Sequence, residues 1–491
     1  MDLWRSRYAE TPLVKTKIVA TVGPACETPE IIAQLVQAGV DLFRLNFAHG
    51  NHEWFAKIIG EIRTLSAKLG RPIGILGDLS GPKIRLGEIP SGSVRCRHGE
   101  RFHFVRTPVP DDATKFTCTY EPLIDDLRVG DRVLLADGTV SLRVVELDPN
   151  RNWVACEVQQ PGVVRSRQGV NLPGVTLSTP SLTAKDRLDL KFALEQQLDY
   201  VSLSFVRSAD DLKLLRSVIA ENQPVVTPWI VAKIEKTEAL ADLERIIQET
   251  DAVMVARGDL GVEADIARVP TLQKQIIKLC NQNRIPVITA TQMLDSMQRN
   301  ELPTRAEVSD VANAVLDGTD AVMLSGETAA GDYPLAAVAM MSRVCQEAER
   351  LLEPRPSLEV PGGLQARTRA TAITESVTCG AGAAAEQLGA DLIVVATRGG
   401  KTAMALSKQR RHTPILALTD QAHVARRMCL FWGVTPVETT AVADPPRELL
   451  KFVERIGREQ QILATGSKLV LVASSDWSKE WHDMLLTHVI T

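Results

Sequence analysis

The sequence lacks long apolar runs, closely paired cysteines and a marked excess of charge of either sign. No apolar run among the 491 residues is long enough to span a bilayer, and the opening residues, MDLWR, contain no apolar signal core. The eight cysteines have no CxxC spacing, which argues against a zinc site or a disulfide framework. The 56 basic and 60 acidic residues leave a formal charge of −4, so neither nucleic acid nor a membrane is an expected partner. These absences predict a protein of the reducing cytoplasm.

Apolar runs rich in Val, Ile and Leu recur through the first two thirds of the chain. They alternate with amphipathic segments such as 29–38, 209–220 and 269–283, a pattern typical of a parallel sheet covered by helices. Eight such units predict a (β/α)8 TIM barrel, in which the chemistry takes place at the C-terminal ends of the strands. The eight runs span residues 15–23, 40–47, 73–79, 199–205, 228–235, 251–259, 285–293 and 321–327.

Residues 83–171 interrupt the barrel pattern after its third strand. Short β-type runs at 101–105, 132–135, 142–147 and 153–159 are separated by turn signals. This pattern predicts a small inserted β-barrel or sandwich. An insertion that leaves and re-enters at the catalytic rim can swing as a lid and exclude water, although a passive elaboration of the fold is the simpler alternative.

A stretch rich in Pro and Gly follows the eighth barrel unit and predicts a linker at 351–368. Beyond it, four further strands alternate with helical stretches and predict a second α/β unit with its own sheet. These strands are expected at 392–397, 415–419, 434–438 and 469–473. The predicted domains are therefore the barrel, from 1–82 and 172–350, the lid, from 83–171, and a C-terminal α/β domain, from 369–491.

One lysine and two carboxylates stand at the ends of neighbouring predicted barrel strands. Lys233 and Glu235 close the fifth run, and Asp259 closes the sixth. Two carboxylates suit a hard octahedral cation such as Mg²⁺, and the lysine adds positive charge. This trio fits phosphoryl transfer, which is helped chiefly by positioning and by cancelling charge on the phosphoryl oxygens. A cluster of surface salt bridges is the alternative.

Seven segments, in the same order along the chain, resemble the motifs of the pyruvate kinase family. They are KIVATVGP from Lys17, FRLNFAHG from Phe43, DLSGPKIR from Asp78, AKIE from Ala232, ARGDLG from Ala256, ATQML from Ala290 and MLSGET from Met323. The resemblance extends over the barrel, the lid insertion and the C-terminal domain. It implies transfer of the phosphoryl group of phosphoenolpyruvate to ADP, giving pyruvate and ATP in the last step of glycolysis, by a homotetramer.

The resemblance assigns roles to the residues at the rim. Glu235 and Asp259 would hold the divalent ion, Mg²⁺ or Mn²⁺ in its place, and Lys233 would stabilise the migrating phosphoryl group. Arg44 would clamp the phosphate, for which a guanidinium offers paired donors. A salt bridge at the rim is the alternative role for Arg44.

Substrate carboxylate binding and proton transfer fall, by the same resemblance, to the next two strand ends. The N–H groups of Gly258 and Asp259 and the hydroxyl of Thr291 would receive the carboxylate, with glycine permitting a close approach. A glycine that only serves a turn is the alternative. The enolate must then take a proton, and either Thr291 or Ser325, through water, is the candidate relay.

The nucleotide side is implied by Asn46, His49 and Arg85, which match the family positions where ADP arrives with a second divalent ion. His49 is equally well interpreted as a packing residue at a strand end. The family often has a lysine just before the segment GVN at 169–171, whereas Arg167 and Gln168 stand here. Contacts between the lid and the nucleotide therefore differ from the common pattern.

Three departures bear on a potassium ion. Many family members carry a serine where Ala48 stands, a lysine at Ser80 and a glutamate at Lys83, and the serine, together with the residues matching Asn46 and Asp78, contributes oxygens to bound potassium. Loss of an oxygen ligand weakens such a site, and the Lys83 ammonium can supply the missing positive charge itself. Potassium is therefore expected to be dispensable, unless Lys83 points into solvent at the lid hinge.

A phosphate-binding loop for a regulatory ligand is predicted in the C-terminal domain. Thr397, Arg398, Gly399, Gly400, Lys401 and Thr402 lie between a strand and a helical run at 403–408, and they match the effector loop of regulated family members. The stretch at 475–479 differs from the loop of members that bind a bisphosphate, so a monophosphorylated sugar is the expected effector. A plain strand-to-helix turn is the alternative.

Two other functions compete with this interpretation. A different barrel enzyme acting on pyruvate or phosphoenolpyruvate, such as an aldolase or a lyase, would not need the lid or the Arg44 motif. A catalytically silent relative would not need Lys233, Glu235 and Asp259 together.

Overall fold

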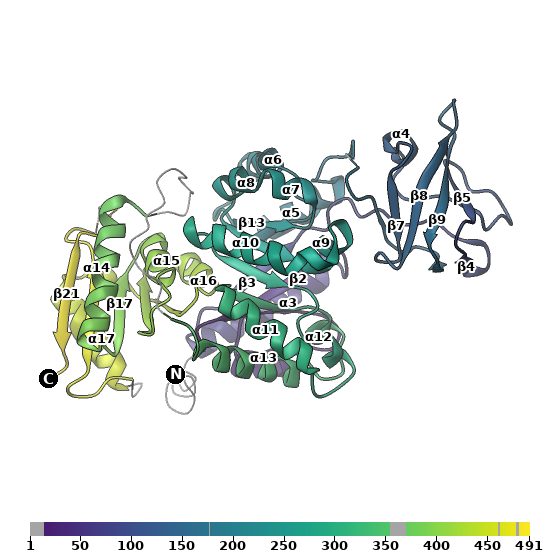
Figure 1. Cartoon of the computed structure of the whole chain (residues 1–491). Helices are drawn as coiled ribbons and strands as arrows, with labels where there is room; N and C mark the ends of the chain where they lie inside the picture. The colour runs from purple at the N-terminus through teal and green to yellow at the C-terminus, as the bar shows by residue number, and fades with distance from the viewer. Residues whose placement is uncertain (1–13, 176, 354–369, 460–461, 478–480) are drawn as a thin grey trace.

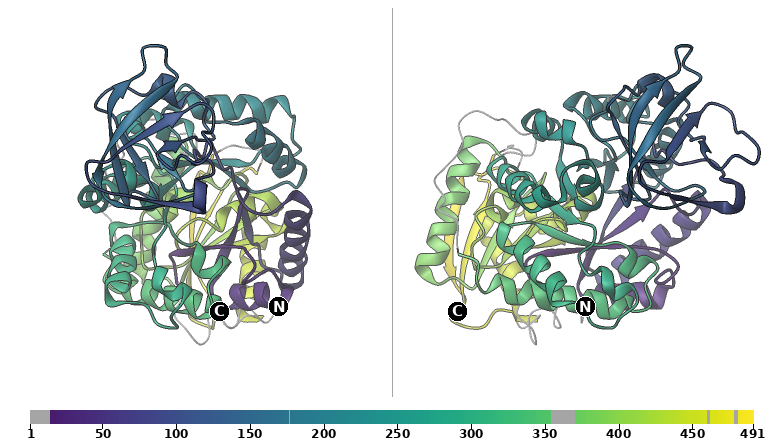
Figure 2. Two further views of the ribbon diagram at one scale, coloured as in Figure 1. Left: turned by 90° about the vertical axis from the view of Figure 1, so that its right-hand side faces the viewer. Right: turned by 45° about the vertical axis from the view of Figure 1, so that its right-hand side comes forward.

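The protein is described by a computed structural model for residues 14–175, 177–353, 370–459, 462–477 and 481–491. Of the predicted linker at 351–368, only residues 351–353 are among the described residues. Three bodies follow one another in Figure 1, with the barrel between the lid and the C-terminal domain. The lid overlies only part of the end of the barrel (Figure 2).

Eight parallel strands close into a barrel in the order β1-β2-β3-β12-β13-β14-β15-β16, which confirms the predicted (β/α)8 fold. The strands are β1 (Lys17–Thr21), β2 (Val40–Asn46), β3 (Gly74–Asp78), β12 (Tyr200–Leu203), β13 (Trp229–Ile234), β14 (Ala252–Ala256), β15 (Val287–Ala290) and β16 (Ala321–Leu324). All eight are shorter than the apolar runs that predicted them. The clearest case is the run at 251–259, where the strand ends at Ala256 because Arg257 already begins a helix.

The barrel helices begin with side-chain caps where the sequence provides them. Thr28 caps one with a proline in its first turn, and Thr304 forms a reciprocal capping box with Glu307. The helices are α2 (Pro29–Ala38), α3 (His52–Leu69), α5 (Ala184–Glu195), α6 (Ala209–Glu221), α7 (Thr237–Ala241), α8 (Leu243–Glu249), α9 (Arg257–Glu263), α10 (Val269–Gln282), α11 (Arg305–Asp317), α12 (Gly326–Ala329) and α13 (Pro334–Glu349). Short 3₁₀ turns lie at Ile266–Arg268 and Asp295–Gln298. The apolar faces of the α-helices pack against the barrel strands and form one buried core with them.

Four buried aspartates stand at the N-terminal end of the barrel, one at the start of every second strand: Asp41, Asp199, Asp251 and Asp320. Each accepts the backbone N–H of the strand before it, at 2.8 to 3.1 Å, from Ile18, Ile75, Ile230 and Val287 respectively. Each is also paired with at least one lysine or arginine. The aspartates therefore fasten neighbouring strands at the end of the barrel that lies opposite the catalytic rim.

The C-terminal domain has a five-stranded sheet in the order β19-β18-β17-β20-β21. Its strands are β17 (Leu392–Ala396), β18 (Ile415–Thr419), β19 (Val434–Glu438), β20 (Lys468–Ala473) and β21 (Met484–Val489), and its helices are α14 (Ala372–Leu388), α15 (Lys401–Ser407), α16 (Ala422–Met428) and α17 (Pro446–Glu459), with a 3₁₀ turn at Thr440–Ala443. The antiparallel edge strand β21 was not predicted, because Thr487 and His488 interrupt its apolar residues, which alternate between partly buried and exposed positions.

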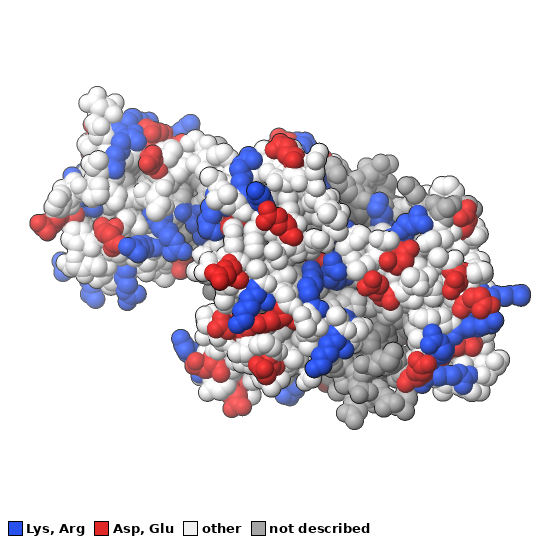
Figure 3. All heavy atoms as spheres, turned by 180° about the vertical axis from the view of Figure 1, so that it is seen from behind, with Lys and Arg blue, Asp and Glu red and all other residues white. Residues whose placement is uncertain are grey.

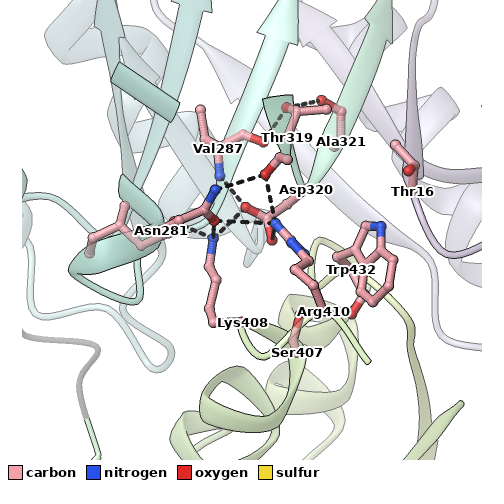
Figure 4. A network of polar contacts seen from close by, with 12 residues as sticks. Thr16, Asn281, Val287, Thr319, Asp320, Ala321, Ser407, Lys408, Arg410 and Trp432 are labelled. Carbon is pink, nitrogen blue, oxygen red and sulfur yellow. Dashed lines mark hydrogen bonds and ion pairs between the residues drawn. The ribbon is translucent and has the colours of Figure 1, made fainter. Parts of the chain in front are cut away.

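The C-terminal domain meets the barrel through cations that reach two of the four aspartates. Lys408, directly after α15, lies 2.5 Å from Asp320 and also donates to the carbonyl of Ile285 at 2.6 Å. Arg410 lies 2.9 Å from the other oxygen of Asp320 and packs over the Trp432 ring (Figure 4). On another side of the barrel, Arg426 of α16 lies 2.6 Å from Asp199. A buried ionic network thus joins the two domains.

The lid is built from two sheets around one apolar core. A six-stranded sheet has the order β11-β7-β8-β9-β5-β6, and β10 pairs with β4 separately, so of the two predicted forms, barrel or sandwich, the lid matches the sandwich. The strands are β4 (Ser93–Cys96), β5 (Arg101–Val105), β6 (Lys115–Phe116), β7 (Arg132–Leu135), β8 (Val140–Leu147), β9 (Trp153–Gln160), β10 (Gly162–Arg165) and β11 (Val170–Asn171), with a 3₁₀ turn at Pro90–Gly92 and a short helix α4 (Leu123–Asp126).

Basic and acidic side chains are interspersed over the face shown in Figure 3. In the part of the chain that the structure describes, no helix combines the length and the apolar character needed to cross a bilayer.

Candidate active site

Lys233 stands at the centre of the polar cluster on the barrel rim. It lies near the end of β13 and is buried, with 9% of the residue exposed. Its ammonium lies 2.9 Å from Glu235 and 3.4 Å from Asp78, and it donates to the Ser204 hydroxyl at 2.6 Å. Burial opposes the charge, but Asp78 and Glu235 outweigh that effect and raise the pKa of Lys233. The lysine therefore remains a cation in the barrel mouth.

Arg44 and Lys233 share the carboxylate of Asp78. The Arg44 guanidinium donates to Oδ2 of Asp78 from Nε at 2.8 Å and from a terminal nitrogen at 2.5 Å, and to the hydroxyl of Thr21 at 3.0 Å. Oδ1 of Asp78 accepts from Ser202 at 2.6 Å. Burial would raise the pKa of Asp78, but Lys233 and Arg44 hold it well below its usual range. The two cations thus have one fixed, ionised counterion.

Glu235 and Asp259 form the acidic side of the cluster. Glu235 is fully buried; one oxygen lies beside Lys233 and the other accepts the N–H of Phe205 at 2.7 Å. Asp259 lies in the first turn of α9, and not at a strand end as the sequence predicted. Burial raises the pKa of Glu235, the charge of Asp259 adds to this, and Lys233 opposes it. The positive charge of Lys233 therefore does not fully offset burial and the mutual repulsion of the two carboxylates.

This donor set fits a divalent cation that completes its coordination with substrate. Among the described residues no group of three or more His, Cys, Asp or Glu is placed to hold a metal. Mg²⁺ is commonly bound in proteins by one or two carboxylates, with phosphate and water as the other ligands. Glu235 and Asp259 match that requirement, and a cation there would relieve the electrostatic cost of burying both.

Thr291 and Gly258 lie against each other at the next strand end. The N–H of Gly258 donates to the Thr291 hydroxyl at 2.7 Å, and that hydroxyl donates to the carbonyl of Ala290. Thr291 has a φ of 68°, which is unusual for a β-branched residue and needs support from its surroundings. Arg257 provides it, because the guanidinium donates to the carbonyl of Thr291 at 2.8 Å and pairs with Asp310.

Ser325 is positioned by the carboxylate of Glu327, a residue for which no role was predicted. Glu327 is buried and accepts the N–H of Ser325 at 2.7 Å and the N–H of Leu294 at 3.1 Å. Burial raises its pKa. Glu327 therefore ties the loop after β15, which begins with Thr291, to the loop after β16.

A cavity of about 360 Å³ lies between the lid and the barrel rim. Its lining includes Lys83, Arg85, Arg167, Lys236 and Asp259. Arg85 donates to the carbonyl of Arg167 at 3.2 Å, which joins the hinge to the lid. With Asp137 also in the lining, four cations face two carboxylates, and this excess of positive charge makes the cavity suited to an anion.

The predicted nucleotide and potassium residues gather beside the same cavity. Burial and the charges of Lys83, Arg85 and Arg44 lower the pKa of His49, so these groups are close neighbours. Lys83 is exposed to solvent, yet partial loss of hydration and the Lys233 charge lower its pKa, and the carboxylates of the rim act in the opposite direction. Asn46 accepts the N–H of Ala48 at 3.2 Å. Lys83 is therefore within electrostatic reach of the cluster.

The predicted effector loop at 397–402 is partly closed by its own hydrogen bonds. The Thr397 hydroxyl accepts the N–H of Gly400, whose φ of 83° suits glycine. The Thr402 side chain is buried and bonded to Nδ1 of His482 at 2.9 Å. The helix after the loop starts at Lys401, two residues earlier than predicted.

The exposed groups of that loop are cationic. Arg398, Gly399 and Lys401 face solvent, and the guanidinium of Arg398 lies 5.4 Å from the centre of the Trp477 ring. The stretch at 475–479 lies only in part within the described residues.

A parallel (β/α)8 barrel with a buried lysine between two carboxylates, under a lid lined by cations, defines an enzyme built to move a phosphoryl group. The family model "Pyruvate kinase, barrel domain" matches residues 13–338, and "Pyruvate kinase, alpha/beta domain" matches residues 375–485. The chain belongs to the pyruvate kinase family. Members of this family are phosphotransferases that use Mg²⁺, phosphoenolpyruvate and ADP and form pyruvate and ATP.

Named relatives agree with this assignment. Pyruvate kinase 2 of Synechocystis sp. is 44% identical over 465 residues, 94% of this chain and 76% of the relative. Pyruvate kinase of Geobacillus stearothermophilus is 43% identical over 459 residues, 94% of this chain and 77% of the relative. The crystal structure of a pyruvate kinase from Cryptosporidium parvum is similar with a TM-score of 0.89 at 33% identity, covering 100% of this chain and 97% of that one.

Proposed function

We propose that this chain transfers the phosphoryl group of phosphoenolpyruvate to ADP through the cluster around Lys233. The observation that carries the proposal is the buried Lys233 ammonium, held between Asp78 and Glu235 at the barrel rim. A fixed positive charge there stabilises the charge that develops on the phosphoryl group in transit, and it requires no rearrangement during the reaction. Arg44, oriented by the same aspartate, clamps the phosphate with its remaining donors.

The substrate carboxylate is received by the N-terminal turn of α9. The N–H groups of Gly258 and Asp259 and the hydroxyl of Thr291 form the receiving group. The contact between Gly258 and Thr291 shows that these donors lie within hydrogen-bond reach of each other. A carboxylate that binds there takes the place of that internal hydrogen bond.

Glu235 and Asp259 hold the divalent ion, Mg²⁺ or Mn²⁺. When bound, it supplies positive charge that helps neutralise the substrate oxygens. The protein contributes the fixed placement of Glu235, whose second oxygen is held by the Phe205 N–H.

Proton delivery to the enolate involves Thr291 or Ser325, through water. Both hydroxyls lie at neighbouring strand ends, and Glu327 joins their loops. No contact distinguishes the two as the donor, so both are retained. Their side chains are partly exposed, which gives water access to each.

The nucleotide occupies the cavity under the lid, with Asn46, His49 and Arg85 on its barrel side. The cations that line this cavity suit the phosphates of ADP. The hydrogen bond from Arg85 to the carbonyl of Arg167 supports the proposal that the lid closes beside the same site.

Lys83 takes the place of a monovalent cation, so potassium is not required. Support comes from the electrostatic influence on Lys83 of Lys233, Asp78, Asp259 and Glu235. Asp78, which the resemblance places among the potassium ligands, already has donors on both oxygens.

Regulation involves a phosphorylated sugar at the loop 397–402 and a homotetramer like those of the family. The exposed Arg398 and Lys401 are the cations available to a phosphate. A ligand in this domain acts on the barrel only by favouring one of two arrangements. A cytoplasmic setting is in keeping with the eight cysteines, whose spacing in the sequence gives no disulfide framework.

The test is a coupled assay of pyruvate release from phosphoenolpyruvate with ADP and Mg²⁺. The proposal requires equal amounts of ATP and pyruvate and no pyruvate without ADP. Pyruvate formed in the absence of ADP would indicate a phosphatase or a lyase instead.

A further inference from the structure

Lys236 is the residue after Glu235, and its side chain is turned away from the Lys233 cluster toward α9. The residue is 5% exposed, and its ammonium lies 2.5 Å from Oε1 of Glu263, the last residue of α9. The other Glu263 oxygen, Oε2, is buried without a hydrogen-bond partner among the described residues. The position of Glu263 therefore depends on Lys236.

The same ammonium is also close to Phe205. It lies 5.9 Å from the centre of that ring, within the range of a cation–π contact. The backbone of Phe205 is held at a φ of 56° and its N–H donates to Glu235. Lys236 therefore contacts the residue that fixes the second oxygen of Glu235.

Helix α9 carries Asp259 and has little of its own to fix its orientation. It is seven residues long, and its N-cap, Ala256, provides no side-chain hydrogen bond. A helix of this length is only marginally stable without tertiary contacts. Arg257 and Gly258 are bonded to Thr291 at one end, and Glu263 is bonded to Lys236 at the other. The contact with Lys236 therefore anchors the C-terminal end of the helix that carries Asp259.

We infer that Lys236 is a positioning residue for the divalent-ion site, acting through Glu263 and Phe205. It joins the end of β13, which leads to Glu235, the loop after β12, which orients Glu235, and α9, which carries Asp259. It acts on the ion site through these residues and not as a ligand of the ion, and it also lines the cavity proposed for the nucleotide. The inference rests on the proposed assignment of Glu235 and Asp259 to the ion.

The competing explanation is that Lys236 only neutralises a buried carboxylate, and a double variant separates the two. Lys236→Met alone leaves Glu263 charged and unpaired in the interior, which is strongly destabilising. Lys236→Met with Glu263→Leu removes both charges and the tie together. If neutralisation is the whole role, the double variant regains both stability and ion affinity. If Lys236 positions the ion site, the double variant regains stability but still binds the ion with lower affinity than wild type.

The experiment measures Mn²⁺ binding to the full chain without substrate, by electron paramagnetic resonance of the free ion, together with thermal unfolding. The double variant is expected to unfold within a few degrees of wild type and to bind Mn²⁺ about 10-fold more weakly, the usual lower limit for loss of a group that orients metal ligands. Glu263→Gln, which keeps the shape and loses the charge, should fall in between. Affinity within 2-fold of wild type in the double variant would overturn the inference.

Two further variants complete the design. Lys408→Met removes the lysine of a matched buried pair at the opposite end of the barrel and should leave Mn²⁺ affinity unchanged. Glu235→Gln tests the proposed ligand directly. If Glu235→Gln binds Mn²⁺ like wild type, the ion assignment itself is wrong. If Glu235→Gln loses binding while the Lys236 variants keep it, only the positioning role is wrong.

Discussion

The Asp78 carboxylate accepts the Arg44 guanidinium on one oxygen, while its other oxygen lies 3.4 Å from the Lys233 ammonium. Two residues from different strands are thus held by one buried anion. Loss of this anion therefore disturbs the phosphate clamp and the catalytic lysine together.

Asp78→Asn should lower kcat/KM for phosphoenolpyruvate by at least about 10-fold, because Arg44 and Lys233 lose the carboxylate that orients them. A 10-fold loss corresponds to about 1.4 kcal/mol of transition-state stabilisation. The substitution should also reduce the free energy of unfolding by about 3 to 5 kcal/mol, since two cations lose their buried partner. Steady-state kinetics and chemical denaturation measure the two effects. Ser202→Ala is the control, because it removes only one neutral donor to Asp78, worth about 1 kcal/mol. Equal effects of the two variants would contradict the ionic role.

Lys233→Met should lower kcat by several orders of magnitude with the fold retained, because a charge that acts in the transition state is lost with little change in volume. Single-turnover kinetics and circular dichroism test this. Retention of more than about a tenth of wild-type kcat, a loss of about 1.4 kcal/mol, would show that the assigned role is wrong.

Potassium chloride should hardly change turnover measured in a buffer whose only other monovalent cation is bulky and organic. The Lys83 ammonium already supplies the charge. Lys83→Glu should make activity depend on potassium, with Ala48 limiting the conversion because one oxygen ligand is still missing. Steep activation of wild type by potassium at constant ionic strength is the result that would refute this prediction.

Wild type should show a sigmoidal dependence on phosphoenolpyruvate that a sugar monophosphate such as glucose 6-phosphate or ribose 5-phosphate makes hyperbolic. Arg398→Ala with Lys401→Ala should abolish that response and leave kcat unchanged, since both side chains are exposed and remote from the rim. Thr402→Ala is a less clean test, because its hydroxyl is bonded to His482 in the interior. Hyperbolic kinetics that no phosphorylated sugar alters would leave the loop as a turn.

Asp320→Asn should destabilise the protein more than Lys408→Met does, because Asp320 serves two buried cations whereas Arg410 remains with Asp320 when Lys408 is removed. The pH dependence adds a second measurement. Burial lowers the pKa of Lys408 from 10.5 to about 8. Between these values the unfolded chain holds the additional proton, so the stability of wild type relative to Lys408→Met should rise with pH. A difference that is flat between pH 8 and 10.5 would contradict this.

The barrel and the trio of Lys233, Glu235 and Asp259 follow from the sequence because they depend on local patterns. Apolar runs define the strands, and the polar residue that ends each run is brought to one rim by the parallel arrangement. The same reasoning missed the start of α9, since the run through Ala256 passes into Arg257 without a capping side chain to mark the boundary.

Other parts of the site could not be read from the chain, because they depend on how the barrel closes. Asp78 meets Lys233 across 155 positions of sequence, and Lys236 meets Glu263 only after α9 folds back on β13. The burial of Thr402 was likewise unpredictable, since His482 reaches it from the far end of the C-terminal domain. Sequence patterns indicate which residues are suited to a role, whereas tertiary packing decides which residues contact each other.

The aspartates at the N-terminal end of the barrel also bear on whether the barrel can be expressed without the C-terminal domain. Both cations that pair with Asp320 in the described part of the chain, Lys408 and Arg410, come from the C-terminal domain, as does Arg426 at Asp199. A barrel expressed alone would expose Asp320 and part of Asp199 as uncompensated anions beside strand ends that they help to fasten. The catalytic domain is therefore not a freely transferable module, and shortened versions would need neutral replacements at these two positions before they folded as independent units.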